Sequence, residues 1–398
     1  MFFGHHFKRE LMNIPNYFFP KNDSTISIVT PRVGDNAFYV FDYLTKQSDY
    51  DVEFMFVQGH IRNPELMSTI FQKFHEIYGV KPKFLRSKEG LSHYYRSKWV
   101  FSDGYVAVTK PVKTQTIVQL WHGYIGKRIG FMNPNNPDET ALFNRTTSLF
   151  TTQSSFLVLQ FMAEFRIPYE KFVITSSPRF DRLLISKSKA RKLLDELGID
   201  VSFRYILLGA PTFRRDKNNN IDPAKSVELL KAYVSNQVQK VLRENDALLI
   251  IKPHPSLTPY LKKLDVSSDN NNIIFLSNET LYENLLGITD ILPAFDMLIT
   301  DYSSVFVDYL LLDRPVIFFV PDYTEVQKTL GYTVDFENYT PGPKVRTSSE
   351  LAETIRYYLN DKVDDKFKMK RHCIRDILIE KSYPHDNTRR LLLDIGLL

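Results

Sequence analysis

The sequence predicts an α/β protein made of two successive parallel sheets. From Ser27 onward, short β-branched or aromatic runs alternate with longer amphipathic stretches, a pattern typical of βαβ units. A basic helical stretch between Asp181 and Asp200 interrupts this alternation, which then restarts. A chain of 398 residues is long enough for two or three domains with cores of their own. We therefore expect two Rossmann-like halves that face each other across a central cleft.

In the first half, apolar runs predict strands and amphipathic stretches predict helices. The predicted strands are residues 26–29, 52–57, 82–85, 99–102, 116–120 and 172–175. The predicted helices are residues 37–46 and 64–78, with a shorter helical piece after His122. We expect the first domain to cover residues 1–190.

The second half repeats the same kind of alternation. Its predicted strands are residues 204–210, 247–252, 272–276, 297–300 and 315–320, and its predicted helices are residues 226–243 and 305–312. We expect the second domain to cover residues 191–379. The remaining residues, 380–398, are expected to form a helical tail that packs back onto the first domain.

The composition excludes several classes of protein. Hydrophobic residues make up 43% of the chain and charged residues 24%, which excludes a disordered chain or a coiled coil as the main architecture. The net charge of +5 is too small for a dedicated nucleic-acid binder, but it suits anionic substrates or an anionic membrane surface. Cys373 is the only cysteine, so no intrachain disulfide can form, which favours the cytoplasm. Charged residues 8–10 interrupt any signal-peptide core, and no apolar run is long enough to span a membrane.

The first candidate for chemistry is a histidine at the end of a predicted strand. The strand at 116–120 leads into His122 and Gly123, and the cations Lys127 and Arg128 follow. Ligands bind at the carboxyl ends of strands in open α/β sheets, and a histidine there can act as a base near neutral pH. A core histidine satisfied by backbone atoms is the alternative; the glycine and the flanking cations favour function.

A second cluster follows the predicted strand at 247–252. Lys252 ends this strand, and His254 lies between two prolines that restrict the local backbone. Rigid cationic groups at this place suit a phosphate. A turn with an incidental histidine explains the segment about as well.

Two further clusters also suit an anionic ligand. Asp301, Ser303 and Ser304 lie between a strand and a helix, where free amides, a helix dipole and two hydroxyls can bind a pyrophosphate. Ordinary N-capping is the alternative, and it explains two adjacent serines less well. Arg214 and Arg215 follow another strand, where they could hold phosphates or form a solvated surface pair.

Other features carry less information. Arg179 and Asp181 lie near the domain junction, where a structural salt bridge is the default expectation. The chain has no H-E-x-x-H motif and no paired cysteines, so we expect no protein-bound metal.

Taken in order, these segments resemble the CDP-glycerol glycerophosphotransferase family, which includes the primases and polymerases of wall teichoic acid and related capsule polymers. The resemblance covers roughly residues 35–344, and the ordered set is more specific than any single motif. It rests on G-x-N (Gly34–Asn36), WHG with a downstream lysine (Trp121–Gly123, Lys127), PR-x-D (Pro178–Asp181), APT-aromatic-R (Ala210–Arg214), KPHP (Lys252–Pro255), LITDYSS (Leu298–Ser304), RPVIFF (Arg314–Phe319), PDY (Pro321–Tyr323) and PGP (Pro341–Pro343).

This resemblance implies a GT-B-like fold and transfer of glycerol phosphate from CDP-glycerol, with release of CMP. It implies that His122 is the base, that His254, Ser303 and Ser304 serve the donor phosphates, and that Asn36 lies near the acceptor side. The other residues expected to bind substrate are Arg214, Lys252, Asp301, Gly123, Lys127 and Arg179. The expected acceptor is a polyprenyl-linked glycan or polyol phosphate, reached by a peripheral enzyme at the inner face of the cell membrane. No cofactor beyond the substrate CDP-glycerol and no nucleic-acid partner are expected.

Three alternatives stay open at this point. The donor could be CDP-ribitol or another polyol derivative, because no feature of the sequence indicates how many carbon atoms the polyol has. A nucleotide-sugar glycosyltransferase on the same fold would release a nucleoside diphosphate instead of CMP. An inactive membrane-associated scaffold would be expected to lack the histidines, and both are present.

Overall fold

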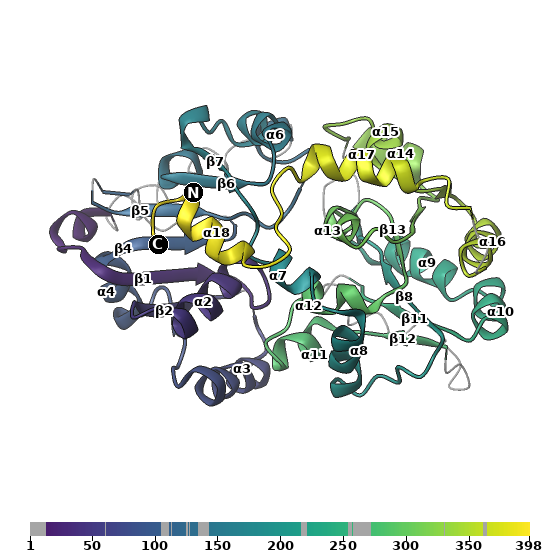
Figure 1. Ribbon diagram of the computed structural model, residues 1–398, viewed down its shortest axis with the longest axis horizontal. Coiled ribbons are helices and arrows are strands. Elements are labelled where there is room, and N and C mark those ends of the chain that lie inside the picture. The colour runs from purple at the N-terminus through teal and green to yellow at the C-terminus, as the bar shows by residue number, and fades with distance from the viewer. Residues whose placement is uncertain are drawn as a thin grey trace.

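The computed structural model shows two α/β halves side by side (Figure 1). It describes residues 13–59, 61–104, 111–112, 114–124, 126, 128–133, 143–215, 221–253, 257, 272–329, 331–360 and 364–398.

The first half is built on a seven-stranded parallel sheet. Its strands lie in the order β3 (Lys83–Phe84), β2 (Asp51–Phe56), β1 (Asn22–Thr30), β4 (Ser97–Ser102), β5 (Thr116–Gln119), β6 (Leu149–Thr152) and β7 (Phe172–Ile174). The helices of this half are α2 (Asn36–Gln47), α3 (Pro64–Tyr78), α4 (Lys88–Arg96), α6 (Ser155–Phe165) and α7 (Phe180–Leu183), with short 3₁₀ turns η1 (Gly130–Met132) and η2 (Tyr169–Lys171).

The second half contains a six-stranded parallel sheet. Its strands lie in the order β12 (Ile273–Phe275), β11 (Ala247–Ile251), β8 (Tyr205–Ala210), β13 (Met297–Thr300), β14 (Val316–Phe319) and β15 (Lys344–Val345), and a small ribbon pairs β9 (Arg214–Arg215) with β10 (Ile221–Asp222). Its helical segments are α8 (Lys187–Glu196), α9 (Pro223–Tyr233), α10 (Asn236–Glu244), α11 (Asn278–Glu283), α12 (Ile288–Ile291), η4 (Leu292–Ala294), α13 (Val305–Tyr309), η5 (Leu310–Leu312), α14 (Tyr323–Thr329), α15 (Phe336–Tyr339) and α16 (Ser348–Tyr358).

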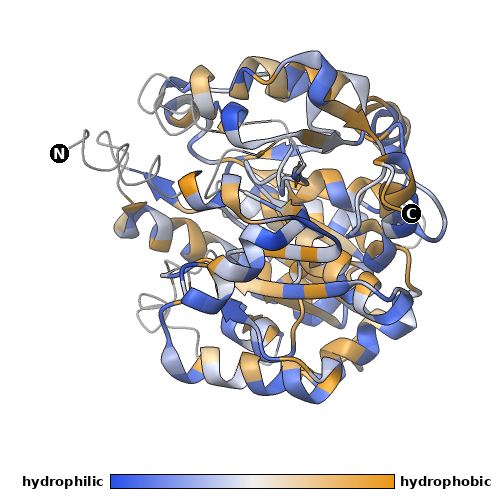
Figure 2. Ribbon diagram, turned by 90° about the vertical axis from the view of Figure 1, so that its left-hand side faces the viewer, coloured by the Kyte–Doolittle hydropathy of each residue, from blue (hydrophilic) through white to orange (hydrophobic). Residues whose placement is uncertain are grey.

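The predicted α/β class with two parallel sheets is confirmed. The strands are mostly hydrophobic, while the surrounding helices mix hydrophobic and hydrophilic residues (Figure 2). This is the pattern expected where helices cover both faces of a parallel sheet. One apolar cluster runs from Trp121 and Phe150 in the first half to Leu298 and Phe306 in the second, so the halves share part of their core.

Some predicted elements were wrong in detail. The single helix expected over 226–243 is two helices, α9 and α10, because Ser235 accepts a hydrogen bond from the amide of Val238 and starts a new helix. The helical piece expected after His122 is absent from the described residues of that segment, apart from the 3₁₀ turn η1. Strand β6 and helices α4 and α6 were not predicted.

The C-terminal residues cross from the second half back to the first. Helix α17 (Lys368–Leu378) packs beside η5 and α6, and α18 (Asn387–Asp394) lies against α2 and α7 (Figure 1). Leu391 and Leu392 of α18 are buried in the apolar core of the first half. Asp181 accepts from the amides of Asn387 at 2.7 Å and Thr388 at 2.9 Å, so it satisfies the free N-terminal amides of α18.

The halves also meet closely at two glycines. A Cβ atom added to Gly34 would lie 2.1 Å from the backbone nitrogen of Gly287, which only glycine at both places permits. The expected domain boundary at residue 190 falls within α8, which packs against η4 and α12 of the second half. No helix in the described part of the chain is long and apolar enough to cross a membrane.

Candidate active site

A cavity of about 1340 Å³ lies between the two halves. Its walls are formed by the loops that follow β1 and β5 in the first sheet and β8, β11 and β13 in the second. In both sheets the strand order reverses at the first strand, β1 or β8, which is where open parallel sheets bind ligands. The polar side chains that line the cavity include Arg32, Asp35, His122, Tyr124, Thr212, Lys252, Asn278, Glu279, Tyr282, Ser303 and Ser304.

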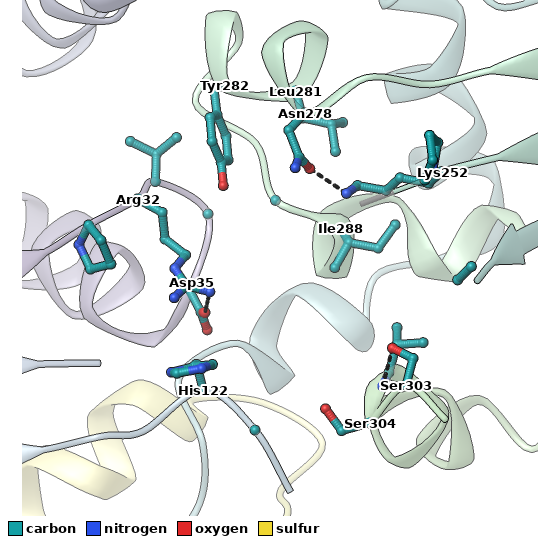
Figure 3. A pocket seen from close by; sticks show the side chains of 18 of the residues that line it. Arg32, Asp35, His122, Lys252, Asn278, Leu281, Tyr282, Ile288, Ser303 and Ser304 are labelled. Atoms are coloured by element: carbon teal, nitrogen blue, oxygen red, sulfur yellow. Dashed lines mark hydrogen bonds and ion pairs between the residues drawn. The ribbon is translucent and has the colours of Figure 1, made fainter. Parts of the chain in front are cut away.

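His122 lies in the wall of the first half and is partly buried (Figure 3). Its Nδ1 lies 3.2 Å from the backbone oxygen of Asp103. Because a carbonyl oxygen can only accept, Nδ1 carries the proton and Nε2 keeps a free lone pair. Burial, together with the positive charge of Arg32, lowers the pKa of His122 to about 3. The ring is therefore neutral at physiological pH and can accept a proton through Nε2.

Two buried side chains hold the backbone around His122. The Asn36 amide donates to the backbone oxygen of Trp121 at 2.8 Å, and Arg179 donates to the backbone oxygen of His122 at 2.8 Å. Trp121 has a φ of 51°, an uncommon conformation for an aromatic residue, so this turn needs such support. Neither Asn36 nor Arg179 lines the cavity, and both position the histidine from behind.

Arg179 is the centre of a buried ionic network. Its Nε lies 3.1 Å from Asp308 Oδ1 and a terminal nitrogen lies 3.3 Å from Asp35 Oδ1. Tyr124 donates to the same Asp308 oxygen at 3.1 Å, and its ring lies beneath the guanidinium. Since Asp35 belongs to the first half and Asp308 to the second, Arg179 ties the two halves together directly behind His122.

Ser303 and Ser304 face His122 from the opposite wall (Figure 3). Ser304 occupies the N-cap position of α13 but makes no side-chain capping bond, and Ser303 Oγ accepts a long hydrogen bond of 3.5 Å from the Val305 amide. A Cβ atom added to Gly123 would lie 3.9 Å from Ser304 Oγ, so the histidine turn and the serines are neighbours. Both hydroxyls can donate to an anion in the cavity.

Asp301 and Arg214 support the serine wall from beneath. The Asp301 carboxylate accepts from the amide of Thr212 at 3.0 Å and from the amide of Tyr302 at 2.6 Å, so it joins the loops after β8 and β13. Arg214 lies 2.7 Å from Asp301 and also pairs with Asp322. Its side chain is 6% exposed and does not line the cavity, so we assign Arg214 a positioning role in place of the expected phosphate contact.

Lys252 lines the cavity at the end of β11 and donates to the Asn278 side chain. Burial lowers the pKa of Lys252 to about 8, so most of the group is still protonated at pH 7 and can bind an anion. Lys252 therefore adds a cation to the same wall that carries the serines.

The structure thus separates the predicted site residues into groups. His122, Gly123, Lys252, Ser303 and Ser304 line one cavity. Asn36, Arg179, Arg214 and Asp301 lie behind its walls. Lys127 and His254 lie outside the described residues.

The cavity wall also contains polar residues that escaped the sequence reasoning, among them Arg32, Asn278 and Tyr282. Arg32 could have been suggested by its place between the first strand and the G-x-N segment, because it too follows a strand end. Asn278 and Tyr282 come from α11, where the sequence showed only a helix start. Among the described residues, no group of three or more His, Cys, Asp or Glu side chains is arranged to hold a metal ion.

Comparison with known proteins decides the family. The model of the CDP-Glycerol:Poly(glycerophosphate) glycerophosphotransferase family matches residues 12–381. The chain belongs to this family. A teichoic acid poly(ribitol-phosphate) polymerase of Bacillus spizizenii is 24% identical over 340 residues, which are 81% of this chain and 48% of that protein. A teichoic acid poly(glycerol phosphate) polymerase of the same organism is 29% identical over 281 residues, 65% of each protein. The chain thus spans about half to two thirds of the length of these relatives.

A comparison with a solved structure confirms the fold. The wall teichoic acid polymerase TagF superimposes with a TM-score of 0.74 and 20% identity, over 98% of this chain and 92% of that chain. At this identity the likeness concerns the fold, and the predicted GT-B-like arrangement is confirmed. This glycerophosphotransferase-family chain therefore has its cavity at the junction of two Rossmann-like halves.

Proposed function

We propose that the protein transfers glycerol phosphate from CDP-glycerol to a hydroxyl group of a teichoic-acid-type or capsule-type acceptor and releases CMP. The observation that carries this function is the position of His122 across one cavity from Ser303, Ser304 and Lys252. A proton acceptor on one wall faces anion-binding groups on the other. Family membership supports the donor and the class of polymer.

The reaction forms a bond between the acceptor oxygen and the glycerol-bearing phosphorus, and it breaks the bond from that phosphorus to the CMP oxygen. The acceptor proton passes to Nε2 of His122, and CMP leaves with the electron pair. The pKa of about 3 belongs to the cavity without an anion. A bound diphosphate beside the ring adds negative charge, which raises the pKa of His122 and makes it a stronger base.

The second half serves the leaving group. Hydroxyl donors from Ser303 and Ser304 and the ammonium of Lys252 neutralise charge on the diphosphate as CMP departs. His254, which the family resemblance assigns to the same phosphates, would add to them. The buried network of Asp301 and Arg214 fixes the loops that carry these donors before the substrate arrives.

Product analysis tests this function directly. Purified protein is incubated with CDP-glycerol and a short lipid-linked acceptor, and nucleotide products and acceptor length are measured. We expect CMP and one or more added glycerol phosphate units. Release of a nucleoside diphosphate from a nucleotide sugar, or no transfer from any CDP-polyol, would contradict it.

CDP-ribitol is the competing donor, because a ribitol-phosphate polymerase is among the similar relatives. The same assay run with both donors at equal concentration decides between them. A kcat/KM at least about tenfold higher for CDP-ribitol would replace glycerol by ribitol and leave the reaction class unchanged.

We further propose that the acceptor is lipid-linked and brings the protein to the cytoplasmic face of the membrane. The basic stretches at 187–192 and 366–371 support this less than their composition suggests. Lys187 and Arg191 both pair with Asp296, and Arg371 is buried. Co-sedimentation with liposomes is expected to increase with anionic lipid content; equal binding to neutral vesicles would count against a charged membrane contact.

A further inference from the structure

Arg32 differs from the other arginines around the cavity. Arg179 and Arg214 are 6% exposed, and each is held by two aspartates. The Arg32 side chain is 34% exposed and lines the cavity. Among the described residues, Arg32 forms an ion pair with the Asp35 carboxylate at 3.7 Å. The same carboxylate lies closer to Arg179, at 3.3 Å. Arg32 therefore keeps positive charge and N–H donors that face the cavity.

The position of Arg32 places it on the acceptor side. Arg32 and His122 belong to the wall of the first half, and the serines belong to the opposite wall (Figure 3). In phosphoryl transfer the attacking and leaving oxygens lie roughly in line on opposite sides of the phosphorus. With CMP held at the serine wall, the acceptor hydroxyl enters from the wall of His122. The part of the acceptor that follows this hydroxyl then passes Arg32.

We propose that Arg32 binds the phosphodiester nearest the attacking hydroxyl of the acceptor, and so selects acceptors that end in a polyol phosphate over neutral ones. This inference rests on the proposed function, and it names the residue that recognises the phosphate of the acceptor. A planar guanidinium with several donors suits a phosphate better than a neutral polyol.

Neighbouring groups are compatible with an anion at this place. Tyr282 of α11 lies in the wall near Arg32 (Figure 3), and burial raises the pKa of its phenol, so the hydroxyl keeps a proton to donate. The charge of Asp35 is shared with Arg179. Burial, with Asp35 nearby, raises the pKa of Asp103 to about 7, which reduces its negative charge near neutral pH.

The test pairs one variant with two acceptors. The first acceptor is a short glycerol phosphate oligomer, and the second is the same oligomer with its last phosphate methylated to a neutral triester. We expect Arg32→Gln to lower the ratio of kcat/KM between charged and neutral acceptors by about 10- to 100-fold, the usual effect of losing a charge-assisted hydrogen bond. Arg32→Lys should keep part of this ratio because it keeps the charge.

Control measurements show whether Arg32 binds the acceptor or the donor. Arg356→Gln removes an exposed arginine outside the cavity and should leave the ratio unchanged. An unchanged ratio in Arg32→Gln overturns the inference, and a raised KM for CDP-glycerol with an unchanged ratio assigns Arg32 to the donor. If the native protein transfers nothing from CDP-glycerol, the proposed function fails, and direct binding of the charged oligomer decides for Arg32. Binding weakened about tenfold or more by Arg32→Gln supports the site, and equal binding refutes it.

Discussion

Two buried arginines beneath the cavity have the same kind of surroundings but connect different parts of the molecule. Arg179 and Arg214 each lie between two aspartates, and each guanidinium covers a tyrosine ring, at 4.9 Å and 5.1 Å. The partners of Arg214, Asp301 and Asp322, both belong to the second half. The partners of Arg179 come from both halves. The same ionic unit therefore supports one wall in one case and joins two walls in the other.

This difference concerns catalysis as well as folding. Arg179 also donates to the backbone oxygen of His122, so the contact that sets the two halves against each other also sets the position of the base. Arg214 reaches the cavity only through Asp301 and the loops that Asp301 joins. Losses at Arg179 should therefore appear in turnover, and losses at Arg214 in donor binding.

The largest expected effect comes from loss of the base itself. The losses of activity expected for the Arg179 and Arg214 variants are smaller than this one. His122→Ala should lower kcat by at least about a hundredfold, the usual contribution of general-base catalysis, because the variant loses the imidazole that takes the acceptor proton. CDP-glycerol binding should change little, as measured by calorimetry. His75→Ala, at an exposed position of α3, is the matched control. Near-normal turnover in His122→Ala would remove the base from the mechanism.

The next effect tests the link between the halves. Arg179→Gln takes the buried cation away from Asp308 and leaves Asp35 with the more distant Arg32, so we expect a loss of about 3–5 kcal/mol in unfolding free energy and a kcat lowered by about tenfold or more. Chemical denaturation and steady-state kinetics measure the two effects. Because Arg179 acts through His122, the double variant with His122→Ala should be hardly slower than His122→Ala alone. Fully additive losses would show that Arg179 has a separate task.

Arg214→Gln tests the other side of the comparison. We expect a similar loss of stability but a different kinetic result: a KM for CDP-glycerol raised about tenfold, with a smaller change in kcat, because the loops that carry Thr212 and Ser303 lose their support. Steady-state kinetics with varied donor concentration measure this. If Arg179→Gln and Arg214→Gln gave the same division between kcat and KM, the two networks would not differ in function.

The sequence predicted most strands because buried parallel strands read as continuous apolar runs. The run at 247–252 corresponds to β11, and that at 297–300 to β13. β6 was missed because its apolar run is only two residues long, Leu149 and Phe150. The described residues between His122 and Asn133 contain only the 3₁₀ turn η1, and the turn at Trp121 takes a left-handed conformation that distant Asn36 and Arg179 support.

The cavity residues were predictable where a polar group follows a strand end, as with His122, Lys252 and the two serines. Arg214 shares that signal, yet it points away from the cavity toward Asp301 and Asp322, which are 87 and 108 residues away in the chain. Arg32 lies close to its own strand but had no motif of its own to mark it. The direction of a long cationic side chain depends on partners that are distant in sequence, and local pattern does not contain them.

The smallest expected effect comes from a buried carboxylate that, among the described residues, has no arginine partner of the kind that Asp301 and Asp308 have. Glu164 in α6 is 1% exposed, accepts from Gln160, and has one carboxylate oxygen without a partner among the described residues. Burial raises the pKa of Glu164 to about 8. The folded protein then holds this proton more tightly than the unfolded chain does. The stabilisation that comes from the protonated Glu164 side chain is therefore complete below about pH 4.5, and the free energy of unfolding falls as pH rises toward 8.

Glu164→Gln mimics the protonated form, so it should match the native protein near pH 4.5 and exceed it at pH 8 by on the order of 2 kcal/mol in unfolding free energy. Denaturant titrations of both proteins across this range measure the difference, and Glu76→Gln, at an exposed position, serves as control. A difference that is constant with pH would mean that Glu164 is ionised in the folded protein. A cation would then have to lie near it, and the contrast with the arginine-paired aspartates would disappear.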